Sequence, residues 1–287
     1  MTDIITSPAN ERLKAVSLLQ TKKKARDEQG LFVIEGLRIT EDALISAYDR
    51  IESIFVNESF LKNSGPEKLM GAVCKRMQAG QTGNEALKPD FAWEDLPVTA
   101  VKDSVFEKIS ETVSPQGVAA VIKKQEPQLS DIVRSGSGTG KKRLLILDDV
   151  RDPGNLGTMM RTAEAAGMDG VIMSGSTVEI YSPKATRSTM GSIFRVPFLY
   201  AEDLCGVIGQ LKKEHFTVYG TCLDSAKDYR DINYAGRTAF VIGNEGNGIS
   251  DPVKECLDQS IFIPMSGAVE SLNAAIAAAI VMYATLP

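Results

Sequence analysis

The second half of the chain contains a series of short apolar runs, and this pattern constrains the fold more than any other feature of the sequence. The runs are bounded by glycine or polar residues and cover 144–150, 169–175, 217–223, 237–243 and 261–264. A helical pattern over 155–166, closed by Gly167, separates the first two runs. Strands buried on both faces of a parallel sheet have this continuous apolar character. The sequence therefore predicts an α/β fold, in which ligands bind beyond the carboxyl ends of the strands.

The first part of the chain shows a second alternation of strands and helices. Its apolar runs cover 31–36, 53–57, 98–101 and 117–122. These runs predict a smaller α/β domain. Between the two parts, residues 125–143 are rich in Ser, Gly and charge, which is typical of a flexible linker. We therefore expect a first domain at 1–125, a linker at 126–142 and a larger domain at 143–287.

A helix is expected near the start of the chain. Ser7 is a favourable N-cap, and Pro8 is favourable at the first helical position. The apolar stripe that this helix would bury consists of Leu13, Val16, Leu18 and Leu19.

Charge and cysteine usage exclude several classes of protein. The formal net charge of −5 excludes a histone-like protein, so binding of nucleic acid would need a local basic patch. The four cysteines form no CxxC and the chain has one histidine, so neither a metal site nor a disulfide framework is expected. Reduced thiols and a polar start of the chain predict a cytoplasmic protein. The most apolar stretch, 274–284, is shorter than a membrane helix of about 20 residues, so no membrane partner is expected.

The first candidate site follows the predicted strand at 144–150. Asn155 and Arg161 lie six residues apart, and both can face one cleft if Asn155 occupies the helix cap. The alternative is that Asn155 only caps the helix and that Arg161 is an ordinary surface residue.

The second candidate site follows the predicted strand at 237–243. Glycines at 243, 246 and 248 let the backbone approach a ligand or adopt positive φ, and Glu245 between them can accept hydrogen bonds. Their G-x-x-G-x-G spacing does not match the dinucleotide-binding fingerprint, which disfavours a nicotinamide-dependent oxidoreductase. The alternative is an ordinary glycine turn.

The third candidate site follows the predicted strand at 261–264. Ser271 and Asn273 stand at the start of a helix that is apolar on nearly every side from 274 to 284. A helix of this kind must be buried all round, and in a domain of this size we expect a second subunit to cover it. Its first amide groups are free to bind an anion. The alternative is a core helix with a polar cap.

Basic residues gather in two places. Lys22, Lys23, Lys24 and Arg26 form a basic run, for which RNA phosphates are the expected partner and a solvated helix end is the alternative. Lys184, Arg187 and Arg195 form a second patch.

Together these stretches resemble the SpoU (TrmH-like) branch of the SPOUT superfamily of S-adenosylmethionine-dependent RNA 2′-O-ribose methyltransferases. The similarity runs in order through N155-x5-R161-T-A, I242-G-N-E-G-N-G-I-S, I263-P-M and S271-L-N-A-A. The first part of the chain is similar to the substrate-binding domain often joined to this family, through FVIEGLR (32–38) and SPQGVAAV (114–121). That domain is similar to ribosomal-protein RNA binders.

The resemblance implies a deep trefoil knot in the second domain, a homodimer formed through that domain, and S-adenosylmethionine bound at the knot. The residues that it assigns to cofactor binding are Leu223, Gly243, Ile263, Met265 and Leu272. The residues that it assigns to the active site are Asn155, Arg161, Glu245, Ser271 and Asn273. The residues expected to bind RNA are Lys22, Lys23, Lys24, Arg26, Arg38 and Arg187.

The predicted function is methylation of a ribose 2′-hydroxyl in structured RNA. Ribosomal RNA is favoured over transfer RNA because the first domain resembles those of the ribosomal members. The resemblance makes Arg161 a candidate general base. Arginine is a poor base, so Arg161 is assigned instead to orienting the hydroxyl and the adjoining phosphate, and the general base stays unassigned. The alternatives are a non-catalytic, ribosome-associated RNA-binding module and a base-directed RNA methyltransferase.

Overall fold

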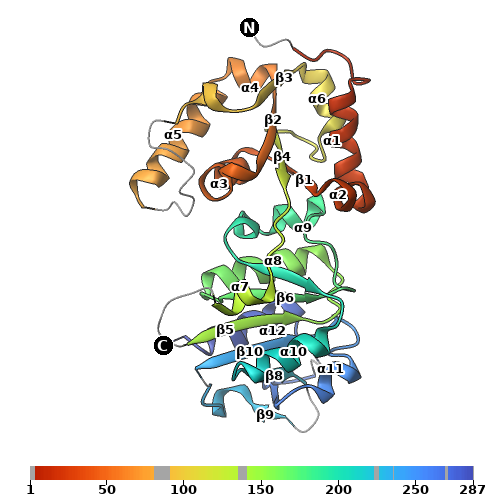
Figure 1. Ribbon diagram of the computed structural model, residues 1–287, viewed down its shortest axis with the longest axis vertical. Helices are drawn as coiled ribbons and strands as arrows, with labels where there is room; N and C mark the ends of the chain where they lie inside the picture. The colour runs from red at the N-terminus through yellow and green to blue at the C-terminus, as the bar shows by residue number, and fades with distance from the viewer. Residues whose placement is uncertain are drawn as a thin grey trace. The chain divides into compact units, whose positions relative to one another are not determined.

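The computed structural model describes residues 4–80, 91–134, 141–222, 226–234, 236–268 and 271–286. The chain forms two compact units, and most of their helices and strands are labelled in Figure 1. The first unit contains residues 1–125 and 181–195, and the second contains residues 126–180 and 196–287. The sequence assigned 181–195 to the second domain, but by its contacts this segment belongs to the first unit.

The first unit is built on a four-stranded mixed sheet. In the order β1-β4-β2-β3, β4 is antiparallel to both of its neighbours, and β2 and β3 are parallel. The strands are β1 (Leu31–Glu35), β2 (Ile51–Asn57), β3 (Val98–Val101) and β4 (Val118–Lys123). The helices are α1 (Glu11–Thr21), α2 (Lys23–Gln29), α3 (Leu37–Ser46), α4 (Glu58–Lys62), α5 (Gly65–Gln78), α6 (Asp103–Ile109) and α9 (Pro183–Ser188). Short 3₁₀ turns cover Tyr48–Arg50, Trp93–Asp95 and Ser192–Phe194.

Helix α1 begins later than the sequence indicates. Asn10 is its N-cap, because the Asn10 side chain accepts a hydrogen bond from the backbone N of Arg12 at 2.9 Å. The predicted cap, Ser7, instead accepts a hydrogen bond from the backbone N of Ala9 at 3.2 Å in the preceding turn. The prediction that the helix starts at Pro8 is therefore wrong.

One face of the first sheet is covered by α1 and α6. Three members of the predicted apolar stripe of α1 are buried there, but Leu18 is 49% exposed. The buried cluster consists of Leu13, Val16, Leu19, Val33, Phe55, Val101, Val105, Phe106, Ile109, Ala119 and Val121. The amphipathic helix was therefore predicted correctly, apart from Leu18.

A buried acidic pair on α3 holds three arginines in the first unit. The Asp42 side chain is 1% exposed, and its Oδ1 accepts hydrogen bonds from Nη1 of Arg76 at 2.8 Å and Nη1 of Arg195 at 3.0 Å. The neighbouring Glu41 accepts hydrogen bonds from Arg76 at 2.9 Å and Arg38 at 3.1 Å. Burial lowers the pKa of Arg76, but hydrogen bonds to the two carboxylates outweigh it and raise the pKa above its usual value.

Replacing Asp42 with alanine is expected to destabilise the protein by about 3–5 kcal/mol, because two partly buried guanidinium groups lose their shared acceptor. Urea unfolding measures this change. The matched control is Glu11→Ala, which breaks the exposed pair to Lys14 and should cost less than about 1 kcal/mol. Equal stability of the two variants would contradict the structural role of Asp42.

The second unit contains a seven-stranded sheet in which all pairings are parallel, in the order β7-β6-β5-β10-β8-β11-β9. The strands are β5 (Lys142–Leu147), β6 (Gly170–Ser174), β7 (Phe198–Ala201), β8 (Thr217–Thr221), β9 (Lys227–Asp228), β10 (Arg237–Ile242) and β11 (Gln259–Phe262). The helices are α7 (Leu129–Arg134), α8 (Pro153–Ala165), α10 (Leu204–Lys213), α11 (Asp251–Glu255) and α12 (Ala274–Tyr283), and a 3₁₀ turn covers Tyr229–Asp231. The predicted α/β fold with a parallel sheet is confirmed.

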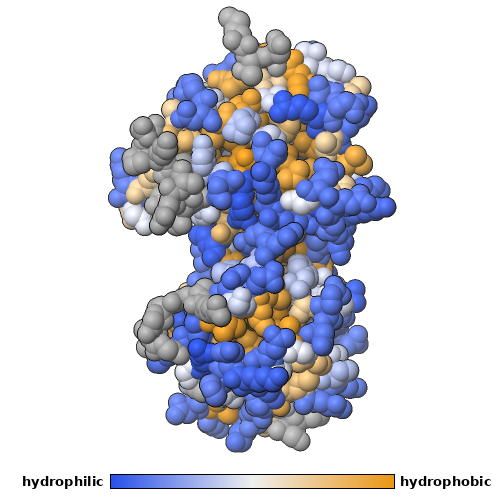
Figure 2. Space-filling model, viewed as in Figure 1, coloured by the Kyte–Doolittle hydropathy of each residue, from blue (hydrophilic) through white to orange (hydrophobic). Residues whose placement is uncertain are grey.

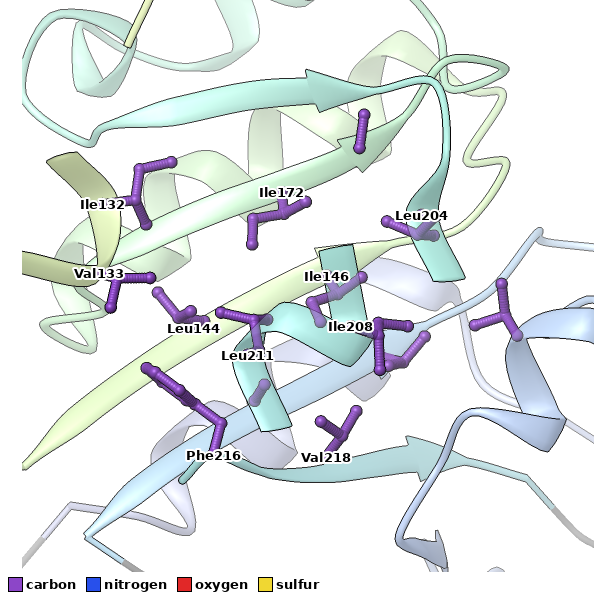
Figure 3. Close-up of a cluster of buried hydrophobic side chains, with 14 of the residues drawn as sticks. Ile132, Val133, Leu144, Ile146, Ile172, Leu204, Ile208, Leu211, Phe216 and Val218 are labelled. Carbon is purple, nitrogen blue, oxygen red and sulfur yellow. The ribbon is translucent and has the colours of Figure 1, made fainter. Parts of the chain in front are cut away.

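Helices α7, α10 and α11 contribute to the core on one face of this sheet. Figure 3 shows side chains of α7 and α10 pointing toward those of β5 and β8. Ile132 of α7 is fully buried, and a side chain at Gly170 of β6 would overlap it. Residues 129–134 are therefore a packed helix, and the prediction of a flexible linker is wrong for them. Three apolar residues, Leu129, Ile132 and Val133, in a polar stretch were too weak a pattern to reveal it.

Helix α12 packs against α8 and β10. Its residues Ala274, Ala278 and Val281 are buried, as predicted for this helix. In contrast, Ile276 is 54% exposed and Tyr283 is 49% exposed in the single chain. The expectation of burial on every side is therefore not met within one copy of the chain.

The part of the chain that the structure describes contains no helix with the length and apolarity needed to cross a membrane. It also contains no group of three or more His, Cys, Asp or Glu residues placed to hold a metal ion. Figure 2 shows that hydrophilic residues cover most of the face in view, with apolar residues in smaller groups between them.

Candidate functional site

A pocket of about 410 Å³ lies at the carboxyl ends of β8, β10 and β11. Ligand sites in proteins typically enclose ~300–1,000 Å³. The lining residues are Thr221, Cys222, Ile242, Gly243, Asn244, Glu245, Gly246, Asn247, Gly248, Ile249, Lys254, Ile261, Phe262, Ile263, Met265, Ser271, Leu272, Ala274 and Ala277. The second and third candidate sites of the sequence therefore line one pocket, at the sheet edge where ligands were expected.

Glu245 connects this pocket to the turn between β5 and α8. Its Oε2 accepts a hydrogen bond from the backbone N of Arg151 at 3.0 Å. Its Oε1 accepts from the backbone N of Asp152 at 3.0 Å and from Nδ2 of Asn155 at 2.9 Å. Burial raises the pKa of Glu245, but hydrogen bonds from Asn155 and the two amides outweigh it, so the pKa is below its usual value. The carboxylate is therefore ionised and acts as an acceptor.

Asn155 also joins the first candidate site to the third. Its Oδ1 accepts a hydrogen bond from Nδ2 of Asn273 at 2.9 Å. Asn273 is the N-cap of α12, and its Oδ1 accepts from the backbone N of Ala275 at 2.9 Å. The N-cap of α8 is Asp152, which accepts a hydrogen bond from the backbone N of Asn155 at 2.8 Å. Asp152 therefore occupies the cap, so the condition under which Asn155 and Arg161 were to face one cleft is not met, although the Asn155 side chain does reach the site.

The glycine-rich turn after β10 is folded tightly on itself. Asn244 and Gly248 exchange two backbone hydrogen bonds of 2.9 Å, and Gly248 has a φ of +70°. A Cβ atom at Gly243 would overlap the backbone of Gly248 and Ile249. The glycines therefore shape the pocket wall, and an ordinary loop with side chains at these positions could not close in this way.

Arg161 lies apart from this network. It is on α8, is exposed, and does not line the pocket. Within the described residues its side chain makes no hydrogen bond or ion pair. The structure of one chain thus brings together Asn155, Glu245, Ser271 and Asn273, but not Arg161.

The residues predicted to bind the cofactor can be placed with one exception. Gly243, Ile263, Met265 and Leu272 all line the pocket. Leu223 lies outside the described residues. Sequence reasoning missed Thr221 and Cys222 at the end of β8, and Lys254 of α11. Thr221 and Cys222 could have been found from the sequence, because they lie at the end of a predicted strand and ligands bind beyond the carboxyl ends of parallel strands.

The residues predicted to bind RNA have different environments. Lys22, Lys23 and Lys24 are exposed at the junction of α1 and α2. Arg26 is 4% exposed, and its Nη1 donates to the carbonyl oxygens of Leu19 at 2.6 Å and Gln20 at 3.0 Å. Arg26 therefore secures the end of α1, and the prediction that it contacts RNA is wrong.

The other two predicted RNA contacts also lie in the first unit. The Arg38 side chain is 62% exposed beside Glu41, and Arg187 on α9 is half-buried. Arg195 of the second basic patch forms an ion pair with Asp42. RNA binding by Arg38 and by Arg187 therefore stays a prediction.

Comparison with known proteins identifies the family. The SpoU rRNA Methylase family model matches residues 142–283, and the MRM3-like substrate binding domain model matches residues 10–120. RlmP of Bacillus subtilis, a 23S rRNA (guanosine(2553)-2′-O)-methyltransferase, is 32% identical over 279 residues, which are 97% of each chain. The chain belongs to the SpoU rRNA methylase family. The predicted family and its S-adenosylmethionine-dependent RNA methyltransferase class are thereby confirmed.

Solved structures show the same fold as this SpoU protein. The AdoMet-bound rRNA methyltransferase from Sinorhizobium meliloti is 29% identical, with a TM-score of 0.78 and coverage of 98% of this chain and 96% of that chain. The SpoU methyltransferase AviRb from Streptomyces viridochromogenes is 23% identical, with a TM-score of 0.75 and coverage of 96% of both chains. The likeness extends over both units.

Proposed function

We propose that this SpoU protein transfers a methyl group from S-adenosylmethionine to a ribose 2′-hydroxyl of ribosomal RNA. One observation carries the proposal: the pocket at the strand ends is joined through Glu245 and Asn155 to the start of α12. RlmP, which is related over nearly the whole chain, is named for this reaction on 23S rRNA. These features favour ribosomal RNA as the substrate.

The pocket has the features that the methyl donor requires. Its wall at Gly243 has no room for a side chain, so backbone forms this part of the surface. Met265 and Leu272 add apolar surface, and Asn244 and Lys254 add polar groups. S-adenosylmethionine, when bound, supplies an electrophilic methyl group. The remaining task of the protein is to hold and orient the RNA hydroxyl.

The polar network around Glu245 is suited to positioning. Glu245 fixes the turn at Arg151 and Asp152, and Asn155 in turn fixes Asn273. Well-oriented reactants can account for ~7–11 kcal/mol of a barrier, which is more than a positioned base contributes at ~10²–10⁴-fold in rate. We therefore assign Glu245, Asn155 and Asn273 to alignment, and Arg161 to the hydroxyl and its phosphate.

The proposal includes a homodimer formed through the second unit. Ile276 and Tyr283 leave an apolar strip exposed on α12 in the single chain, and a second copy of the chain would cover it. The trefoil knot and the cytoplasmic location are further parts of the proposal, and both rest on the family resemblance.

The test measures binding and methyl transfer separately. Calorimetry should detect binding of S-adenosylmethionine to the protein alone. Labelled-methyl transfer is then compared on unmodified transcripts of 23S rRNA and of tRNA, and nuclease resistance of the bond 3′ to the modified nucleotide distinguishes ribose from base methylation. Binding without transfer would favour the non-catalytic module, whereas transfer only to tRNA would overturn the choice of substrate.

The exposed lysines at the junction of α1 and α2 are expected to contact RNA phosphates. Replacing Lys22, Lys23 and Lys24 with alanine is expected to weaken RNA binding and to reduce its logarithmic salt slope by about 2, at ~0.7 per phosphate contact. Binding of a 23S rRNA transcript at several salt concentrations measures this slope. Lys213→Ala on α10 is the control. An unchanged salt slope in the triple variant would mean that Lys22, Lys23 and Lys24 form only a solvated helix end.

A further inference from the structure

Arg151 is held at both ends beside the candidate active site. It lies in the turn between β5 and α8, one residue before the N-cap of α8. Its backbone N donates to Glu245, the same carboxylate that binds Nδ2 of Asn155. At the other end of the residue, Nη2 lies 2.6 Å from Oδ1 of Asp149. Arg151 therefore places a cation beside Asp149, in a turn whose backbone is bound by Glu245 of the candidate site.

Asp149 is itself anchored at the exits of three strands. It follows β5, and its backbone N donates to Oγ of Ser174 at the end of β6, at 2.9 Å. Nδ2 of Asn244, which follows β10, donates to the Asp149 carbonyl at 2.9 Å and to its Oδ2 at 3.2 Å. Asp149 has a φ of +59°, a left-handed conformation that Asp and Asn tolerate better than most residues. Its carboxylate is thus a rigid support for Arg151.

The ion pair leaves most of the Arg151 guanidinium free. The Arg151 side chain is 63% exposed, and Asp149 is its only ion-pair partner among the described residues. Oδ1 of Asp149 is shielded from solvent and accepts no hydrogen bond from the described residues. The positive charge of Arg151 therefore balances the negative charge of this carboxylate. A guanidinium has five N–H donors in a planar fork. Donors remain for a ligand that approaches from the solvent side.

A purely structural role explains this arrangement less well. The turn is already fixed by hydrogen bonds to Glu245 and Asn244. Neutralising the shielded Oδ1 of Asp149 uses only one edge of the guanidinium, and the rest of the Arg151 side chain, 63% exposed, faces solvent. A planar cation held by a carboxylate is suited to bidentate binding of a phosphate, the anion that RNA presents along its backbone.

We propose that Arg151 binds a phosphate of the RNA backbone next to the ribose that is methylated, and that Asp149 fixes the orientation of its guanidinium. This inference rests on the proposed function and adds a residue to it that the family resemblance did not assign.

The chain offers a closely matched control. Arg230 is also 63% exposed, and its Nη2 lies 2.6 Å from Oδ2 of Asp228. It follows the edge strand β9 and does not line the pocket. Arg230→Ala therefore removes the same charge from an equally exposed guanidinium at a different place, although Arg230 is hydrogen-bonded to both carboxylate oxygens of its partner.

The test compares Arg151→Ala, Arg151→Lys, Asp149→Asn and Arg230→Ala on an unmodified 23S rRNA transcript. Arg151→Ala should raise the KM for RNA about tenfold, as loss of a charged hydrogen bond predicts, and should reduce the salt slope by about 1. Arg151→Lys should lose less, because it keeps the charge. Asp149→Asn should raise the KM with little change in slope, because Arg151 stays charged but is no longer fixed. S-adenosylmethionine affinity should be unchanged in the two Arg151 variants.

Two outcomes would overturn the inference. One is a wild-type KM and salt slope in Arg151→Ala. The other is an equal effect of Arg230→Ala, which would mean that any exposed cation contributes alike. RNA binding by fluorescence anisotropy needs no turnover. It therefore still tests phosphate binding by Arg151 if the wild-type protein transfers no methyl group. Absence of methyl transfer by the wild-type protein would reject the proposed function, not the role of Arg151 in RNA binding.

Discussion

Arg161→Ala is expected to lower methyl transfer to RNA by about 10³-fold while leaving the affinity for S-adenosylmethionine unchanged. Removal of one preorganised group that stabilises developing charge costs about 10²–10³-fold in rate, and loss of RNA alignment adds to this. Cofactor affinity should persist because Arg161 is exposed and does not line the pocket. Single-turnover methyl transfer and calorimetry measure the two quantities independently.

Arg161→Lys distinguishes charge from geometry. Lysine keeps the positive charge but lacks the planar fork that can contact a hydroxyl and a phosphate together. We expect Arg161→Lys to recover a small part of the lost rate. Wild-type turnover in Arg161→Ala would remove Arg161 from the mechanism, and the site would then consist of the Glu245 network alone.

The proposed dimer explains why Arg161 is expected to matter although one chain leaves it outside the pocket. Arg161 is on α8, and α8 packs against α12, the helix whose Ile276 and Tyr283 are exposed. A second copy covering α12 would therefore approach the helix that carries Arg161. Sedimentation of the protein with Ile276→Glu tests this step, since a charge on a buried interface should shift the protein to monomer.

The central strands of the larger sheet could be predicted because their pattern is local. The strand in 144–150 is apolar at consecutive positions, and burial on both faces of a parallel sheet requires this. Strand β9, with only Lys227 and Asp228, could not be predicted, since its pairing is supplied by β11. The start of α1 likewise depends on a distant contact. Ile5 forms a bridge to Val101 of β3, and Ser7 then lies in the turn between this bridge and α1, where the backbone N of Asn10 donates to the Ser7 carbonyl at 3.2 Å.

The candidate site was predictable in its residue types but not in its connections. Asn155 and Glu245 were singled out because each lies a few residues beyond a predicted strand, and Asn273 because it stands at the start of the predicted last helix. Parallel strands end at one edge of the sheet, which brings the loops after them together. Spacing along the chain carries no signal for the hydrogen bonds that join them across 90 and 118 residues. The left-handed Asp149, which supports Arg151, has no sequence signal either, because an aspartate at a strand end looks like any polar turn residue.

Gly243→Ala tests whether the pocket wall is as rigid as its packing indicates. The added Cβ would overlap the backbone of Gly248 and Ile249, and backbone cannot move aside as the end of a side chain can. Overpacking of this kind costs ~1–3 kcal/mol. The turn must shift to relieve it, which moves the pocket wall. We therefore expect affinity for S-adenosylmethionine to fall by at least about tenfold, since 1.4 kcal/mol corresponds to a factor of ten.

Gly209→Ala on α10 is the control. Apart from the adjoining residues and backbone of its own helix, no atom lies within 4 Å of a Cβ at Gly209, which is not among the glycines with positive φ and does not line the pocket. Its alanine variant should bind S-adenosylmethionine like the wild type and unfold at no lower a temperature, because alanine favours a helix over glycine. Calorimetry and thermal unfolding of both variants separate the two positions. Wild-type binding in Gly243→Ala would mean that the turn can open without loss of the pocket, and the assignment of a rigid backbone cradle for the methyl donor would then be wrong.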